Sequence, residues 1–172
     1  MKNEEKTLFQ AVVVFFVRDD KILLARKKVK IGAGCLNGYG GGIEEGETPP
    51  SAAVREVFEE SSGVNVLERD LEQIADTFFM NIREDGSRFV CRVHVFIARE
   101  WVGEFLPTEE MSDPEWYLIS DLPFDQMLPA DRHWLPLALC GQKVIVRASY
   151  GPFQKELVGT VEVIKVNAFA SD

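Results

Sequence analysis

Three glutamates, Glu56, Glu59 and Glu60, occupy positions i, i+3 and i+4 of a segment rich in helix formers. Because successive helical residues are about 100° apart, carboxylates at this spacing fall within one arc of a helix. Their mutual repulsion and the C-terminal helix dipole both disfavour this arrangement unless a divalent cation reverses the two penalties. Mg²⁺ prefers oxygen ligands and substrate phosphates. The triplet therefore indicates either a magnesium site or, as is commoner for such a pattern alone, a solvated acidic face.

The residues around the triplet form a longer pattern. Gly41 is followed after five residues by Glu47, and after seven more by Arg55, which begins the run that holds the glutamates. This pattern resembles the signature of the Nudix hydrolases through its catalytic portion, with a Nudix box at residues 41–64. The resemblance implies a catalytic set of Glu47, Arg55, Glu56, Glu59 and Glu60, in which Arg55 pairs with Glu47 to brace the loop against the helix. It also implies that the three glutamates of the triplet hold Mg²⁺, or Mn²⁺ in its place.

One departure follows the glutamates. The family usually places one residue before the closing glycine, whereas Ser61 and Ser62 both precede Gly63 here. We expect the helix to gain a residue or a bulge at its end, with the ligand geometry intact.

The resemblance extends over most of the chain and is strongest to the MutT-like branch that sanitises the nucleotide pool, the mammalian-type oxidised purine nucleoside triphosphatases. In that branch the residue at Asn37 binds the purine edge, which suits an amide that offers a donor and an acceptor. Lys27 would lie beside the phosphates, and Gly40 and Gly41 against the substrate. Composition alone favours a turn residue at Asn37, and it fits an exposed surface lysine at Lys27 as well as one beside phosphates. The fragments that carry the resemblance are 27–28, 32–34, 37–41, 94–96, 110–111, 122–124 and 134–136.

The base-reading residues are only partly retained. The branch uses two neighbouring aspartates, and the matching pair here is Ala130 and Asp131, while Leu128 replaces a stacking aromatic residue. Loss of an acceptor or a stacking face costs about 1 to 3 kcal/mol each. The preference for an oxidised guanine nucleotide such as 8-oxo-dGTP therefore stays open, and Asp131 is alternatively a helix N-cap.

Other side chains carry two interpretations each. Trp134 is assigned to substrate binding and, with Phe79, could line a base pocket, although large aromatic residues are more often core. His94 alternates with valines and is expected to be structural. Glu110 is a candidate for activating water, since some Nudix enzymes use a glutamate outside the box, or else a solvated loop residue.

Composition excludes several classes of protein. The chain has 172 residues, 46% hydrophobic, and a formal net charge of −9, which disfavours binding to a nucleic acid polymer. The apolar run 11–17 is too short to span a membrane, and three scattered cysteines fit neither a disulfide framework nor a zinc site. We expect a cytoplasmic protein, a monomer or homodimer, that binds a small nucleotide near its densest basic cluster, residues 26–30.

The elements that must position these residues follow from periodicity and turn signals. A helix is expected over 52–62, capped by Thr48 and ended by Gly63, and a second helix over 131–139. The glycine-rich segment 31–46 is expected to be a loop packed closely against something. The fold class is therefore α+β, a single domain over 1–172 with a mixed central β-sheet packed between helices as an α/β/α sandwich. Strands are expected at 8–17, 22–25, 71–82, 88–98, 116–119, 143–149 and 157–166.

Together with these residues, the resemblance implies a Mg²⁺-dependent pyrophosphohydrolase of oxidised or modified purine nucleoside triphosphates, in which Glu59 deprotonates water and the products are the monophosphate and pyrophosphate. One alternative is a Nudix hydrolase of another nucleoside diphosphate derivative, such as a dinucleoside polyphosphate or a nucleotide sugar. Another is a non-catalytic nucleotide-binding module.

Overall fold

The computed structural model describes residues 7–30 and 32–171. Its centre is a mixed sheet with the order β3-β2-β1-β6-β5-β8-β9, to which β4 adds beside β1 and β7 beside β2. The pairs β1·β6 and β5·β8 are parallel and the others antiparallel, so the predicted mixed sheet is confirmed. The strands are β1 (Gln10–Arg18), β2 (Lys21–Arg26), β3 (Leu36–Asn37), β4 (Tyr39–Gly42), β5 (Leu71–Ile82), β6 (Arg88–Ala98), β7 (Glu115–Leu118), β8 (Lys143–Tyr150) and β9 (Glu162–Val166).

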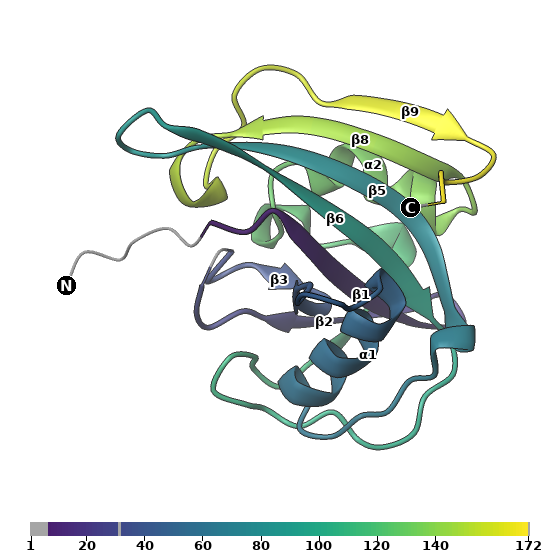
Figure 1. The fold of residues 1–172 in the computed structure, drawn as a ribbon. Coiled ribbons are helices and arrows are strands. Elements are labelled where there is room, and N and C mark those ends of the chain that lie inside the picture. The colour runs from purple at the N-terminus through teal and green to yellow at the C-terminus, as the bar shows by residue number, and fades with distance from the viewer. Residues whose placement is uncertain (1–6, 31, 172) are drawn as a thin grey trace.

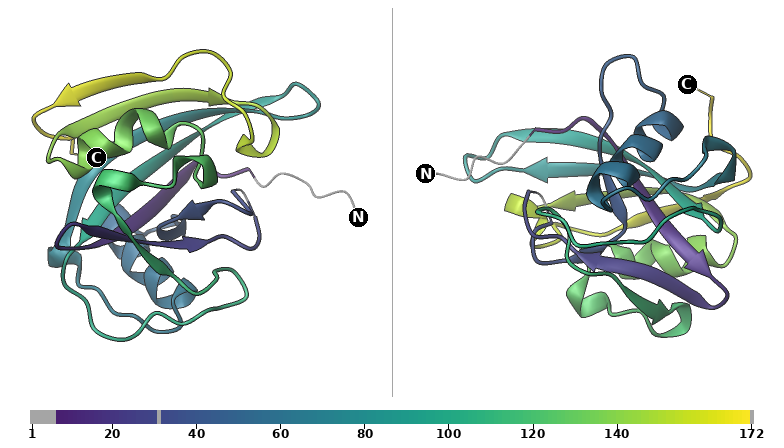
Figure 2. Two further views of the ribbon diagram at one scale, coloured as in Figure 1. Left: turned by 180° about the vertical axis from the view of Figure 1, so that it is seen from behind. Right: turned by 90° about the horizontal axis from the view of Figure 1, so that it is seen from below.

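Two helices cover opposite faces of this sheet. Helix α1 (Pro49–Glu60) lies on the face toward the viewer in Figure 1, and α2 (Asp131–Leu139) lies behind the sheet, as the reverse view in Figure 2 shows. Strand β1 is buried on both sides, because Val14 and Phe16 pack in the α1-side core and Phe15 and Val17 in the α2-side core. The predicted α/β/α sandwich is confirmed.

The described residues also include four short 3₁₀ helices: η1 (Glu68–Asp70), η2 (Ile119–Asp121), η3 (Phe124–Gln126) and η4 (Pro152–Gln154). The hairpin 71–82/88–98 and the helix 131–139 have the predicted bounds. The last predicted strand is shorter than expected, because it pairs with β8 only over Glu162–Val166 and through an isolated bridge between Leu157 and Tyr150.

The glycine-rich segment is not simply a loop. Its described part holds β3 and β4, which pair with β2 and β1; residue 31 lies outside the described residues. The expected close packing is present, since a Cβ on Gly40 would lie 1.9 Å from the Val12 carbonyl oxygen. Glycine is therefore required there because β4 crosses β1 at backbone contact, not because the segment is irregular.

Helix α1 begins as predicted and ends early. Thr48 caps it, with its hydroxyl accepting from Ser51 N at 3.2 Å, and Pro49 is the first helical residue. The helix stops at Glu60, so the expected extension to residue 62 is wrong. Ser62 instead adopts φ +64°, and Gly63 N–H donates to the Phe58 carbonyl at 2.9 Å, a helix-closing turn that absorbs the extra residue.

The expectations about membrane spans and cysteines can be compared directly with the structure. In the described part of the chain, no helix is long and apolar enough to cross a membrane. Cys35, Cys91 and Cys140 are all free thiols, as their spacing predicted.

Candidate active site

Arg55 connects α1 to the end of β4 and to the loop that follows it. Arg55 donates from Nε to Glu47 Oε1 at 2.7 Å and from Nη2 to Glu47 Oε2 at 2.9 Å, which is the predicted pairing in two-pronged form. Its Nη2 also donates to the Gly42 carbonyl at 2.9 Å. The Arg55 hydrogen bonds, followed by the backbone N–H of Glu44, hold the pKa of Glu47 down at about 2. The pair therefore stays ionised and fixes the end of β4 against the helix.

The Glu56 carboxylate is held between this arginine and Gly41. Arg55 Nη1 donates to Glu56 Oε1 at 2.8 Å. A Cβ on Gly41 would lie 2.5 Å from Glu56 Oε2, so only glycine leaves space for the carboxylate at this position. The atoms nearest to Gly41 in this respect belong to the Glu56 side chain and not to backbone.

Glu60 is a buried carboxyl group beside a second glutamate. Its side chain is 4% exposed and accepts a hydrogen bond from Gly40 N at 3.0 Å. Burial is the main cause that raises its pKa to about 7; Lys27 and the Gly40 N–H oppose the rise, and Glu110 and Glu56 add to it. Glu110 is half-buried and ion-paired to Lys30 Nζ at 2.7 Å, which lowers its pKa. Glu110 is therefore a neighbour of Glu60 that is ion-paired and half-buried, and not a solvated loop residue.

The three glutamates of the triplet have different environments. Glu56 and Glu60 line a small cavity of about 80 Å³ with Lys27 and Lys30, which we call the acidic cavity. Glu59 has a side chain that is 58% exposed and lies 3.4 Å from Arg55 Nη1. Over residues 7–30 and 32–171, no three His, Cys, Asp or Glu side chains already converge as a metal-binding group. Each of the three carboxylates accepts a hydrogen bond within the protein, Glu56 and Glu59 from Arg55 and Glu60 from Gly40 N–H.

A second cavity, of about 110 Å³, adjoins the first and brings together all six predicted substrate-binding residues. The two cavities share Leu8, Lys27, Gly40 and Gly41. Asn37 belongs to β3 and not to a turn, and its Oδ1 accepts from Gly38 N at 2.8 Å. The six residues in the lining are Lys27, Asn37, Gly40, Gly41, Asp131 and Trp134.

Asp131 is a buried acid in this cavity rather than a helix cap. It is 3% exposed and is the first residue of α2, whose N-cap is Ala130 without a side-chain cap. Burial raises its pKa to about 7, opposed by the Leu128 backbone and then by the Trp134 indole. The Trp134 Nε1 atom is buried and makes no hydrogen bond of standard geometry with any described residue, although it lies near enough to Asp131 to stabilise its charge.

Trp134 and Phe79 lie where both of their interpretations place them, in the core and beside a cavity. Trp134 and Phe79 belong to the α2-side core and also line the 110 Å³ cavity. His94 is buried in β6 beside Gln10 and Gln73, as expected for a structural histidine. Sequence reasoning missed Thr77, Asn81 and Gln154 in the cavity lining. The alternation of β5 places Thr77 and Asn81 on the face of Phe79, but only the fold brings Gln154 there.

Comparison with known proteins decides the family. A family model described as the NUDIX domain matches residues 7–138. The chain belongs to the Nudix family. The oxidized purine nucleoside triphosphate hydrolase of Mus musculus is 36% identical over 131 residues, 76% of this chain and 80% of the relative. The protein of the same name from Danio rerio is 39% identical over 127 residues, 74% and 77% of the two chains.

A solved structure of a Nudix-type protein agrees in fold. The MutT protein from Bacillus halodurans superposes with a TM-score of 0.72 at 21% identity, over 91% of this chain and 97% of its own. In this Nudix hydrolase the extra residue of the box, at Ser61–Ser62, follows the glutamates and is accommodated outside the helix. The insertion therefore leaves Glu56, Glu59 and Glu60 on consecutive turns of α1.

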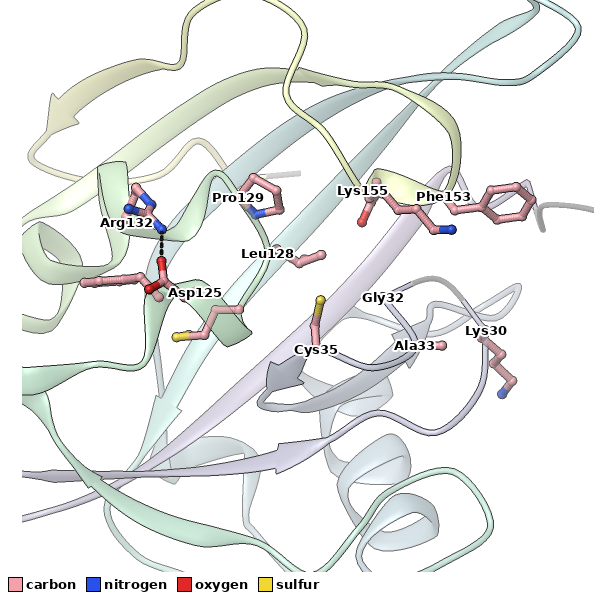
Figure 3. Close-up of a pocket in the computed structure, with 13 residues that line it drawn as sticks. Lys30, Gly32, Ala33, Cys35, Asp125, Leu128, Pro129, Arg132, Phe153 and Lys155 are labelled. Atoms are coloured by element: carbon pink, nitrogen blue, oxygen red, sulfur yellow. Dashed lines mark hydrogen bonds and ion pairs between the residues drawn. The ribbon is translucent and has the colours of Figure 1, made fainter.

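A third and larger cavity, of about 790 Å³, lies beside the other two in the Nudix fold. It shares Lys30 with the acidic cavity and Leu128 and Gln154 with the 110 Å³ cavity. Figure 3 shows Phe153 and Lys155, from the loop after β8, across from Gly32 and Ala33 in the loop after β2. Its charged lining residues are Lys30, Asp125, Arg132 and Lys155, a local excess of positive charge on an acidic chain.

Proposed function

We propose that this protein is a divalent-metal-dependent pyrophosphohydrolase of purine nucleoside triphosphates, oxidised or otherwise modified, that releases the monophosphate and pyrophosphate. The observation that carries the proposal is the junction of the two smaller cavities at Lys27, Gly40 and Gly41. The larger of these, about 110 Å³, is below the volume of about 300–1,000 Å³ that encloses whole ligands, so it suits the base alone. The phosphates then extend past Lys27 to the glutamates. The two relatives from mouse and zebrafish carry names that agree with this substrate class.

The donor set fits Mg²⁺ or Mn²⁺. Glu56 and Glu60 line one small cavity, and the exposed Glu59 lies on the same helix, three residues from Glu56 and therefore on the same side of it. Carboxylate oxygens without nitrogen or sulfur ligands suit a hard cation, and the buried Glu60 would be favoured as an anion beside a positive charge. A bound cation would lower the pKa of a coordinated water and offset the charge that builds on the phosphoryl oxygens.

The remaining residues position the reactants. Arg55 and Glu47 hold α1 against β4, and Lys27 neutralises phosphate charge next to the base cavity. Glu59, the most exposed carboxylate of the three, is our assignment for the group that takes the proton from the attacking water. Asn37 and Asp131 would bind polar groups of the base, with Trp134 and Phe79 against its faces.

The larger cavity favours one second candidate. A substrate with another group beyond its phosphates, such as a dinucleoside polyphosphate or a nucleotide sugar, could extend past Lys30, which lines both cavities, toward Phe153 and Lys155. The partner in either case is a small nucleotide and not a nucleic acid polymer. For either substrate class we propose a cytoplasmic protein that is a monomer or a homodimer.

The deciding experiment measures kcat/KM, with Mg²⁺, on purine and pyrimidine triphosphates, 8-oxo-dGTP, a dinucleoside tetraphosphate and a nucleotide sugar. The proposal predicts pyrophosphate release that is fastest with a purine triphosphate. Faster cleavage of the dinucleotide or sugar compound would instead favour the second candidate. Nucleotide binding without cleavage of any compound would leave only a binding module.

A further inference from the structure

We propose that Asn81 and Gln154 form a base-reading pair that presents one hydrogen-bond acceptor to the purine and selects bases that offer an N–H group to it. The inference deepens the proposed function and rests on it. Both residues have uncharged amide side chains and line the 110 Å³ cavity, and neither belongs to the Nudix box. Gln154 also lies beyond residues 7–138, the range that the family model matches.

Both amides are removed from bulk water. Asn81 has 0% of its surface exposed and Gln154 has 7%. Gln154 Nε2 donates to Asn81 Oδ1 at 2.8 Å, so two side chains 73 positions apart in the sequence are joined inside the cavity wall. A buried amide is costly unless its polar atoms are paired, which makes the remaining atoms of this pair significant.

The direction of the hydrogen bonds is fixed by the backbone. The carbonyl oxygen of Phe79 can only accept, and Asn81 Nδ2 donates to it at 2.9 Å. Asn81 must therefore present Oδ1 toward Gln154, and Gln154 must answer with Nε2. Gln154 is left with its Oε1 acceptor, to which no residue in the described part of the chain donates. The pair therefore keeps one acceptor for a ligand at a residue that lines the 110 Å³ cavity.

The backbone around Gln154 holds this orientation at a cost. Phe153 and Gln154 both adopt φ +58°, a left-handed conformation that is rare and unfavourable for residues other than glycine. The loop is closed by Gly151 N–H donating to the Glu156 carbonyl at 2.9 Å. This strained turn directs the Gln154 side chain inward, while its neighbour Lys155 is exposed.

Gln154 lies where two of the cavities meet. It lines both the 110 Å³ and the 790 Å³ cavities, so its side chain is part of the wall between them. Gln154 is not among the residues that the 110 Å³ cavity shares with the cavity of Glu56 and Glu60, so our proposal places its acceptor at the end of the base cavity away from the glutamates. A purine amino or ring N–H group at that end would complete the hydrogen bonds of the pair.

The test compares wild type with Gln154→Met, which keeps the length of the side chain and removes the acceptor. Both kcat/KM and Kd are measured for dGTP, dITP, dATP and purine deoxyriboside triphosphate, which differ in their amino and ring N–H groups. We expect Gln154→Met to weaken binding of the nucleotides that carry the recognised N–H by about 10-fold or more, through Kd and KM rather than kcat. Nucleotides without that group should change by less than 3-fold.

Gln142→Met is the matched control, because Gln142 is exposed in the turn before β8 and lines none of the three cavities. It should behave as wild type with all four nucleotides. Asn81→Leu, which removes the anchor of Gln154, should reproduce the same selectivity and serves if Gln154→Met does not fold. Equal losses on all four nucleotides, losses under 3-fold on all four, or losses that do not follow an N–H group would overturn the inference. The Kd values test this inference, whereas turnover by the wild-type protein tests the proposed hydrolysis. The two claims can therefore fail separately.

Discussion

Gly41→Ala is the substitution for which the structure gives the sharpest expectation. The new Cβ would lie 2.5 Å from Glu56 Oε2 and 2.7 Å from Glu56 Oε1, whereas ordinary contacts begin at 3.4 Å. The overlap falls on the end of a flexible side chain and not on backbone, so the carboxylate can rotate away. Rotation breaks the 2.8 Å ion pair with Arg55 Nη1 and moves Glu56 from the acidic cavity.

The two costs of this change differ in size. An ion pair that is partly open to water contributes about 1 kcal/mol or less, so the free energy of unfolding should fall by no more than that. A displacement of about 1 Å in a catalytic group costs about 100-fold in rate. We therefore expect Gly41→Ala to lose about 100-fold in kcat/KM and to keep a melting temperature within a few degrees of wild type.

The assay is pyrophosphate release with Mg²⁺ together with thermal unfolding followed by circular dichroism. Gly40→Ala is the contrasting variant, because its Cβ would lie 1.9 Å from the Val12 carbonyl oxygen and would force β4 from β1. It should lose stability by about 3 kcal/mol or more. A Gly41→Ala protein with wild-type kcat/KM would refute the reasoning that Glu56 acts from the position seen here.

Three further predictions concern single residues. Glu59→Gln should abolish turnover without lowering the melting temperature, because Glu59 is 58% exposed; wild-type turnover would remove its assignment as the base. Asp131 has its pKa raised from 3.8 to about 7, so the native state holds a proton that the unfolded chain releases, and the free energy of unfolding should fall as pH rises from about 4 to 7. Asp131→Asn should remove about 2–4 kcal/mol of this fall in denaturant titrations across the range, while Glu60, whose pKa is also raised, keeps its own share; an unchanged fall would contradict the burial of the acid. Ser62→Gly should raise the free energy of unfolding by about 0.5–1 kcal/mol, since Ser62 is exposed at φ +64°; a destabilised variant would contradict the turn geometry.

Local patterns predicted most of the elements because they report local physics. The hairpin 71–82/88–98 has the predicted bounds because alternation and an Asp-Gly turn determine it. The helix end at residue 62 was wrong because the rule that glycine ends a helix placed the left-handed residue at Gly63, whereas Ser62 takes that conformation first. The strands β3 and β4 were missed because glycine has low strand propensity, and only contact with β1 and β2 makes them strands.

The candidate site divides in the same way. Spacing along α1 was sufficient to nominate Glu56, Glu59 and Glu60, and the box pattern to pair Arg55 with Glu47. Sequence could not show which groups contact the carboxylates, because the contacts of Glu60 with Gly40 N–H and of Glu56 with Gly41 depend on the three-dimensional placement of β4. It also could not place Gln154 beside Asn81, since nothing local in either segment refers to the other.

The central claim is that the carboxylates of α1 hold a divalent cation at the mouth of the base cavity. Its most direct test is an electron paramagnetic resonance titration of free Mn²⁺ with wild type and with a Glu56→Gln, Glu60→Gln double variant, each with and without a non-hydrolysable purine triphosphate. We predict that wild type depletes free Mn²⁺, more strongly with nucleotide, and that the double variant loses most of this binding while remaining folded. Equal depletion by the two proteins would contradict the claim.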